Sequence, residues 1–158
     1  RDRLIHAGAV PVVAAALDDD STWSITHARN AIWTLSNLCR GKPPPGIDAI
    51  KPAIPTLVRS LRHTDDEVLI DALWACGYVC EQKEGVELIV TCGAVPLVMA
   101  QLMSSNVQVV TRAMRVLGNL CASTREHVAL VTNSGLLQAI PNLLASPTES
   151  IQKEAAWT

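Results

Sequence analysis

A tryptophan followed four residues later by an asparagine is the feature of this sequence best suited to binding chemistry. The pair is Trp33 and Asn37, in the stretch RNAIWTLSNLCR. On a helix, residues four apart lie on one face, about 5–6 Å apart at Cβ. A carboxamide is both donor and acceptor, so it can satisfy the free backbone groups of an extended peptide. An indole face attracts the cationic end of Lys or Arg, for about 0.5–2 kcal/mol per contact.

The same stretch recurs at a fixed period along the chain. Four landmark positions are separated by 41, 41 and 42 residues: Trp33, Trp74, Arg115 and Trp157. The position four residues after the landmark holds in turn Asn37, Tyr78 and Asn119. A constant period in this range is typical of stacked helical repeats. The sequence therefore predicts a ladder of aromatic and polar side chains, with one rung per repeat.

Helices of three kinds are expected to position this ladder, because each unit contains a short, a medium apolar and a long amphipathic segment. The long helices, which carry the landmarks, are expected over 23–40, 66–82, 107–122 and 148–158. The medium helices are expected over 10–17, 53–62, 95–103 and 136–145, and the short ones over 1–6, 47–51, 86–92 and 125–133. Gly93 and Gly135 are expected to end short helices, and the run GKPPPG at 41–46 excludes a helix there.

The predicted fold class is all-α: one array, 1–158, of about four three-helix repeats. The repeats are expected over about 1–42, 43–83, 84–123 and 124–158, the last of them truncated. The first unit also opens on what reads as its first helix. Because repeat arrays need polar capping units at their ends, we expect exposed apolar surface at both ends of this chain.

Composition argues against several classes of function. A net charge of −2 and a pI of about 6.1 disfavour a general affinity for nucleic acid or for an anionic membrane. The chain has no run of 18 apolar residues, so no transmembrane helix is expected. The four His lack nucleophile or carboxylate partners in repeat register, and there is no Gly-rich phosphate loop, so we expect no enzyme and no cofactor. The five Cys read as buried reduced thiols, and no metal site is expected.

The unit resembles the armadillo repeat, which has a short first and a long third helix in about 41–42 residues. The Trp-x-x-x-Asn motif at Trp33–Asn37 narrows the resemblance to the importin-α (karyopherin-α) family, over nearly the whole chain. The order Trp/Asn, Trp/Tyr, Arg/Asn, Trp is similar to that family's central armadillo repeats, which lose the regular pair between a major and a minor binding groove. The resemblance implies that the repeats form a right-handed superhelix. It also implies that this chain covers the fourth repeat to the start of the seventh repeat of the family.

The resemblance implies a nuclear import adaptor that binds Lys/Arg-rich nuclear localisation signals, in extended form, along a concave Trp/Asn groove. It also implies an importin-β carrier that binds parts of the protein absent from this sequence, and shuttling between cytoplasm and nucleus. The alternative is another armadillo scaffold, such as a β-catenin-like adhesion or signalling module, that binds a different peptide. Such modules use basic grooves for acidic partners, and the slightly acidic balance of this chain disfavours them.

Charged and polar residues complete the predicted site. Positions three residues before a landmark share its face, so the carboxylates of Asp71 and Glu154 are expected to meet Lys or Arg heads. Arg115 interrupts this lining; it is expected to repel a cation and to favour a peptide carbonyl or an acidic linker residue. The roles of Arg40, Glu81 and Arg112 stay open. The predicted peptide-binding residues are Asn30, Trp33, Asn37, Asp71, Trp74, Tyr78, Arg115, Asn119, Glu154 and Trp157.

Overall fold

The computed structural model describes residues 1–18 and 24–158, and every regular element in these ranges is a helix. The prediction of an all-α chain is therefore confirmed for the described residues. The predicted start of the first long helix, at Trp23, lies outside them. In chain order the helices are α1 (Asp2–His6), α2 (Ala9–Asp18), α3 (Ile25–Cys39), α4 (Ile47–Ile50), η1 (Lys51–Ala53), α5 (Ile54–Ser60), α6 (Asp66–Val79), α7 (Lys83–Thr91), α8 (Ala94–Ala100), η2 (Gln101–Met103), α9 (Val107–Cys121), α10 (Arg125–Asn133), α11 (Leu136–Leu144) and α12 (Glu149–Trp157).

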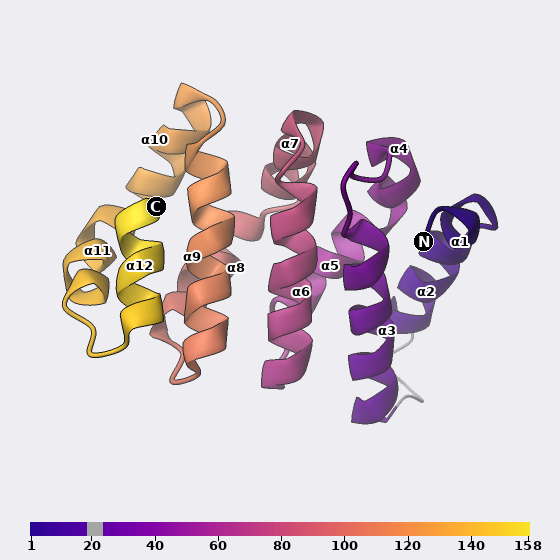
Figure 1. Cartoon of the computed structure of the whole chain (residues 1–158), viewed down its shortest axis with the longest axis horizontal. Coiled ribbons are helices and arrows are strands. Elements are labelled where there is room, and N and C mark those ends of the chain that lie inside the picture. The colour runs from indigo at the N-terminus through magenta and orange to yellow at the C-terminus, as the bar shows by residue number, and fades with distance from the viewer. Residues whose placement is uncertain (19–23) are drawn as a thin grey trace.

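The long helices form one layer of the molecule and the shorter helices form the other. Figure 1 shows α3, α6, α9 and α12 side by side, and each contacts the next. The pairs α1/α2, α4/α5, α7/α8 and α10/α11 lie behind and around this row. We call the outward surface of α3, α6, α9 and α12 the third-helix face. The two ends of the stack expose apolar side chains, as expected: Leu4 and Val12 at one end, Leu137 and Leu144 at the other.

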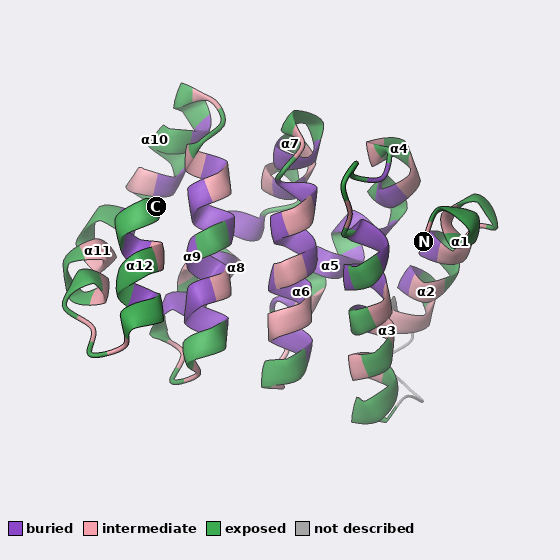
Figure 2. Ribbon diagram, in the orientation of Figure 1, coloured by how far each residue is buried: buried purple, intermediate pink, exposed green. Residues whose placement is uncertain are grey.

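The helical period explains why the landmarks stay outside the core. A residue two positions further on points about 200° around a helix, toward the opposite side. Those positions hold Leu35, Cys76 and Leu117, and all three are fully buried. Figure 2 shows the resulting pattern, with buried bands on α3, α6 and α9 next to exposed ones. Burial of this inner row of side chains fixes the rotation of each long helix and so aims the landmark outward.

Glycine makes the turn between the first and second helices of a unit. Gly93 precedes α8 with φ 78°, and Gly135 precedes α11 with φ 100°, both in the left-handed region that a side chain disfavours. The short helices therefore end where the sequence indicates. The 41–46 segment contains no helix, also as expected.

Polar bonds that span one repeat period tie neighbouring units together. Side-chain amides donate to backbone carbonyls from Gln82 to Pro45 (3.1 Å) and from Gln101 to Leu61 (3.1 Å). One such joint is ionic: Arg29 on α3 donates two hydrogen bonds to Asp65, of 3.1 and 2.6 Å, and one to Glu67, of 3.0 Å. Asp65 is also the N-cap of α6, where its carboxylate accepts from the Val68 amide. One carboxylate thus starts a helix and joins it to the preceding repeat.

This joint predicts an acid-sensitive contribution to stability. The hydrogen bonds from Arg29 hold the pKa of Asp65 below its ordinary value of 3.8. The contribution is therefore present above that value and is lost as the pH falls through the lower, folded-state pKa. Asp65→Asn keeps a good N-cap but removes the charge. We expect this variant to melt about 1–3 °C lower at pH 7, and the difference to vanish in acid, when melting is followed by circular dichroism. A difference that persists at pH 2 would contradict the ionic account.

In the described ranges, no single helix is both long enough and apolar enough to cross a membrane. One bent pair, Lys83–Thr91 with Ala94–Met103 at 83°, meets the criterion of length and composition only. No group of His, Cys, Asp and Glu in the same ranges is arranged to hold a metal ion.

Candidate functional site

All ten residues predicted from the sequence to bind a peptide lie on the four third helices. Asn30, Trp33 and Asn37 are on α3; Asp71, Trp74 and Tyr78 on α6; Arg115 and Asn119 on α9; and Glu154 and Trp157 on α12. Each of them is exposed or half-buried, and none belongs to the core. The hypothesis of a ligand-facing ladder fails if Trp33, Asn37 and Trp157 lie inside the hydrophobic interior or on the outer convex wall. All three are exposed, which excludes the interior. Their role in binding stays a prediction.

On α3, the side chain of Trp33 is the most open rung of the ladder. It is 59% exposed, and no ring or cation contact to it is found among the described residues. Asn37 Nδ2 donates to the backbone carbonyl of Trp33 over 2.9 Å, which fixes the orientation of the carboxamide. This bond uses one amide hydrogen. The carboxamide oxygen and the second hydrogen remain available to a ligand's backbone.

On α6, Trp74 is half-buried and already has partners. Its ring stacks on Tyr78, with centroids 5.2 Å apart and planes inclined by 18°. The guanidinium carbon of Arg112, from α9, lies 3.7 Å from the centroid of the Trp74 ring. Both contacts are in the range of favourable aromatic and cation–π geometry. Tyr78, which replaces the expected asparagine, therefore serves here as a stacking partner.

On α9 and α12, Arg115 contacts two of the predicted residues at once. Its Nε and a terminal nitrogen donate to the two carboxylate oxygens of Glu154, over 2.9 and 2.5 Å. Its guanidinium carbon also lies 4.5 Å from the centroid of the Trp157 ring. The sequence analysis expected Glu154 to meet a cation from a ligand; in the structure it meets a cation from the chain itself.

Two backbone features complete this end of the face. The Trp157 ring packs directly over Gly118, where an added Cβ would overlap the ring. Asn119 Nδ2 donates to the carbonyl of Gly77 over 3.1 Å, across one repeat. Sequence reasoning missed Gly118. It also left the role of Arg112 open, although Arg112 stands three residues before a landmark, the same register that singled out Asn30, Asp71 and Glu154.

The charged groups on this face have pKa values that are shifted in different directions. Burial raises the pKa of Asp71, and the neighbouring Glu67 adds to this rise. The hydrogen bonds with Glu154 raise the pKa of Arg115, whereas burial lowers that of Arg112. Arg112 Nε is buried and has no hydrogen-bond partner in the part of the chain that the structure describes. Between α6 and α9 lies a cavity of about 210 Å³, lined by Leu73, Trp74, Gly77, Tyr78, Glu81, Arg112, Arg115 and Asn119.

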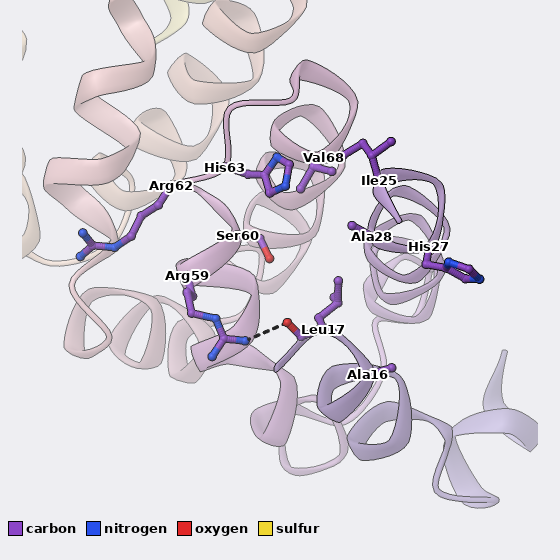
Figure 3. Close-up of a pocket in the computed structure, with 10 residues that line it drawn as sticks. All are labelled: Ala16, Leu17, Ile25, His27, Ala28, Arg59, Ser60, Arg62, His63 and Val68. Atoms are coloured by element: carbon purple, nitrogen blue, oxygen red, sulfur yellow. Dashed lines mark hydrogen bonds between the residues drawn. The ribbon is translucent and has the colours of Figure 1, made fainter. Parts of the chain in front are cut away.

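A larger pocket lies away from these residues. It measures about 520 Å³ and is lined by parts of α2, α3, α5, α6 and the adjoining turn. Figure 3 shows Arg59 in it, donating to the Leu17 carbonyl over 3.4 Å, while Arg62 and His27 point outward. None of the ten predicted residues lines this pocket. Its basic side chains do not suit a cationic ligand, so we place the candidate site on the third-helix face.

Comparison with known proteins supports an armadillo-repeat fold. The family model for the armadillo/beta-catenin-like repeat matches residues 1–40, 82–122 and 124–158, and that for the HEAT-like repeat matches 27–79. Over 74 residues, the chain is 46% identical to importin subunit alpha-2 of Arabidopsis thaliana and 45% identical to importin subunit alpha-1a of Oryza sativa subsp. japonica. Each alignment covers 47% of this chain and 14% of the relative, so the chain spans only a small part of the length of these relatives.

Solved structures show the same architecture over nearly the whole chain. A designed armadillo repeat protein in complex with the peptide (KR)4 superposes with a TM-score of 0.89 at 25% identity, covering 99% of this chain and 65% of the other. A second designed armadillo repeat protein gives a TM-score of 0.86 at 25% identity, with the same coverage. The predicted solenoid of three-helix repeats is thereby confirmed.

Proposed function

This chain belongs to the armadillo-repeat family, with importin-α subunits among its relatives, and on that premise we propose that its third-helix face binds Lys/Arg-rich nuclear localisation signals. The peptide lies extended across α3, α6, α9 and α12, and the protein acts as a nuclear import adaptor. The observation that carries this proposal is the exposed Trp33 indole, beside an Asn37 carboxamide held in position by the Trp33 carbonyl.

The geometry of an extended peptide matches the repeat. Packed helices are about 8–10 Å apart and an extended chain advances about 3.3 Å per residue, so each repeat serves two or three peptide residues. Alternate side chains point the same way from an extended strand, which suits one basic residue per tryptophan. Asn37 and Asn119 meet the peptide backbone, while the aliphatic stem of Lys or Arg lies along the indole and its charge stays near the ring face.

Charge supplies the preference for a basic ligand. Asp71 lies one helical turn before Trp74, with no cation paired to it among the described residues. It is therefore positioned to neutralise a Lys or Arg head near α6. The Arg112 and Arg115 stretch suits the linker between two basic clusters better than a cluster itself. A designed armadillo repeat protein of the same fold has been solved in complex with the peptide (KR)4, which supports the proposal of a basic ligand.

The importin alpha subunits among the relatives of this chain support a proposal about the wider role of the protein. We propose that the whole protein shuttles between cytoplasm and nucleus and meets an importin-β carrier through parts outside this chain. The armadillo repeat is a scaffold type of fold, and we assign this chain a binding role with no catalytic step of its own.

Titration with two octapeptides tests the proposal. One peptide alternates Lys and Arg and the other alternates Asp and Glu, and each carries a fluorophore for anisotropy. We expect the basic peptide to bind at least about tenfold more tightly, because each indole and carboxamide contact contributes about 1 kcal/mol. Equal binding, or preference for the acidic peptide, would refute the proposal. The second result would favour a β-catenin-like scaffold instead.

A further inference from the structure

Helix α9 carries two arginines that each lie against a tryptophan of a neighbouring repeat. Arg112 reaches back to Trp74 on α6, and Arg115 reaches forward to Trp157 on α12. Figure 1 shows α9 between these two helices. One helix therefore supplies a cation to the aromatic rungs on both of its sides.

The register of the repeat shows why this happens at α9. The landmark and the position three residues before it hold, in the other units, the pairs Asn30/Trp33, Asp71/Trp74 and Glu154/Trp157. In the third unit both positions are arginine. This helix thus presents two cations on the surface where its neighbours present an indole and a polar or acidic group.

The two arginines are held differently. Arg115 is neutralised by its two hydrogen bonds to Glu154, whose side chain is only 15% exposed. Arg112 forms no ion pair with any described residue, and its Nε is buried without a hydrogen-bond partner. The Arg112 guanidinium lies against the face of Trp74, and the Glu154 carboxylate also attracts it electrostatically. Trp33, by contrast, has no cation against its ring among the described residues.

We propose that the guanidinium groups of Arg112 and Arg115 occupy the positions at Trp74 and Trp157 where a basic side chain of the ligand would otherwise bind. This inference rests on the proposed function and refines its specificity. A basic side chain of the ligand enters without competition at Trp33, whereas at Trp74 or Trp157 it has to displace an arginine. Arg112 thus becomes a specificity-determining residue, although it needs no contact of its own with the peptide.

The test measures binding of the Lys/Arg octapeptide to the chain and to Arg112→Gln. Extended, this peptide spans about 26 Å, enough to cross about three repeats. We expect Arg112→Gln to bind about threefold to tenfold more tightly, because a freed indole face becomes available to the ligand. Arg115→Gln, which frees both Trp157 and Glu154, is expected to tighten binding at least as much. It serves as the second variant if Arg112→Gln fails to fold by circular dichroism.

A matched control separates occupation from simple repulsion between like charges. Arg125→Gln removes the same charge from α10, at an exposed position off the third-helix face, and is expected to leave affinity within about twofold at about 0.15 M salt. In addition, Arg112→Gln is combined with Trp74→Ala. Compared with Trp74→Ala alone, the double variant should bind no more tightly, since there is no longer a ring face to free.

Each outcome of these binding measurements either supports or overturns the inference. The inference is overturned if Arg112→Gln and Arg115→Gln bind no more tightly than Arg125→Gln, or if the gain from Arg112→Gln survives the loss of Trp74. A different failure identifies a wrong premise: if the unaltered chain does not distinguish the basic from the acidic octapeptide, the proposed function falls, and this inference falls with it.

Discussion

Replacing Trp33 and Asn37 together by alanine is expected to weaken binding of a Lys/Arg-rich peptide at least about tenfold. The variant removes the open indole face and the carboxamide beside it, and each contact contributes about 1 kcal/mol. Neither side chain belongs to the core, so the fold should survive. Fluorescence anisotropy with the Lys/Arg octapeptide measures the loss, and circular dichroism confirms that the helices remain.

The control for this experiment changes a similar pair on another surface. Leu137 and Gln138 are adjacent exposed residues of α11, an apolar and an amide side chain that lie off the third-helix face. The double replacement Leu137→Ala with Gln138→Ala should leave affinity unchanged. If both double variants lose affinity alike, or neither does, Trp33 and Asn37 do not form the site.

The largest effect on stability is expected for Leu117→Ala. Leu117 is fully buried in the middle of α9, two residues after the landmark Arg115, and belongs to the continuous core. Truncation of such a residue removes apolar contact and leaves a cavity, which typically lowers the free energy of unfolding by about 2–5 kcal/mol. Urea denaturation followed by circular dichroism measures this change.

Leu137→Ala provides the comparison, since Leu137 is 62% exposed. We expect this surface change to alter the free energy of unfolding by no more than about 0.5 kcal/mol. Equal losses for the two leucines would show that the inner row of side chains, which orients the third-helix face, has been assigned to the wrong register.

Periodicity made most of the fold predictable. The recurrence of the landmark located all four long helices and led to the expectation that Trp33 and Trp157 lie outside the core. Helix ends were less predictable. The third short helix was expected from Val86, but α7 begins at Lys83, with Gln82 as its N-cap and no side-chain capping bond to mark the start. The cues that start a helix are local and weak, whereas the apolar repeat sums over many residues.

The composition of the site was predictable, but its internal contacts were not. Register alone placed ten residues on one face. The contact of Arg112 with Trp74 joins residues 38 positions apart, and that of Arg115 with Glu154 joins residues 39 apart. Long flexible side chains can adopt many rotamers, so their partners depend on the rotation and spacing of the helices. The sequence signal that could have identified Arg112, and was not used, is its register, which it shares with Asn30, Asp71 and Glu154.

The absence of a side chain at Gly118 limits which repeat units can replace one another. The ring of Trp157 leaves no volume for a side chain there, while the first unit carries Ser36 at the same place in its repeat. If a unit with serine at that position preceded Trp157, the serine side chain would displace the indole from its contact with the backbone. Repeats of this kind therefore cannot be exchanged independently. The residue three positions after one landmark has to be selected together with the landmark of the next repeat.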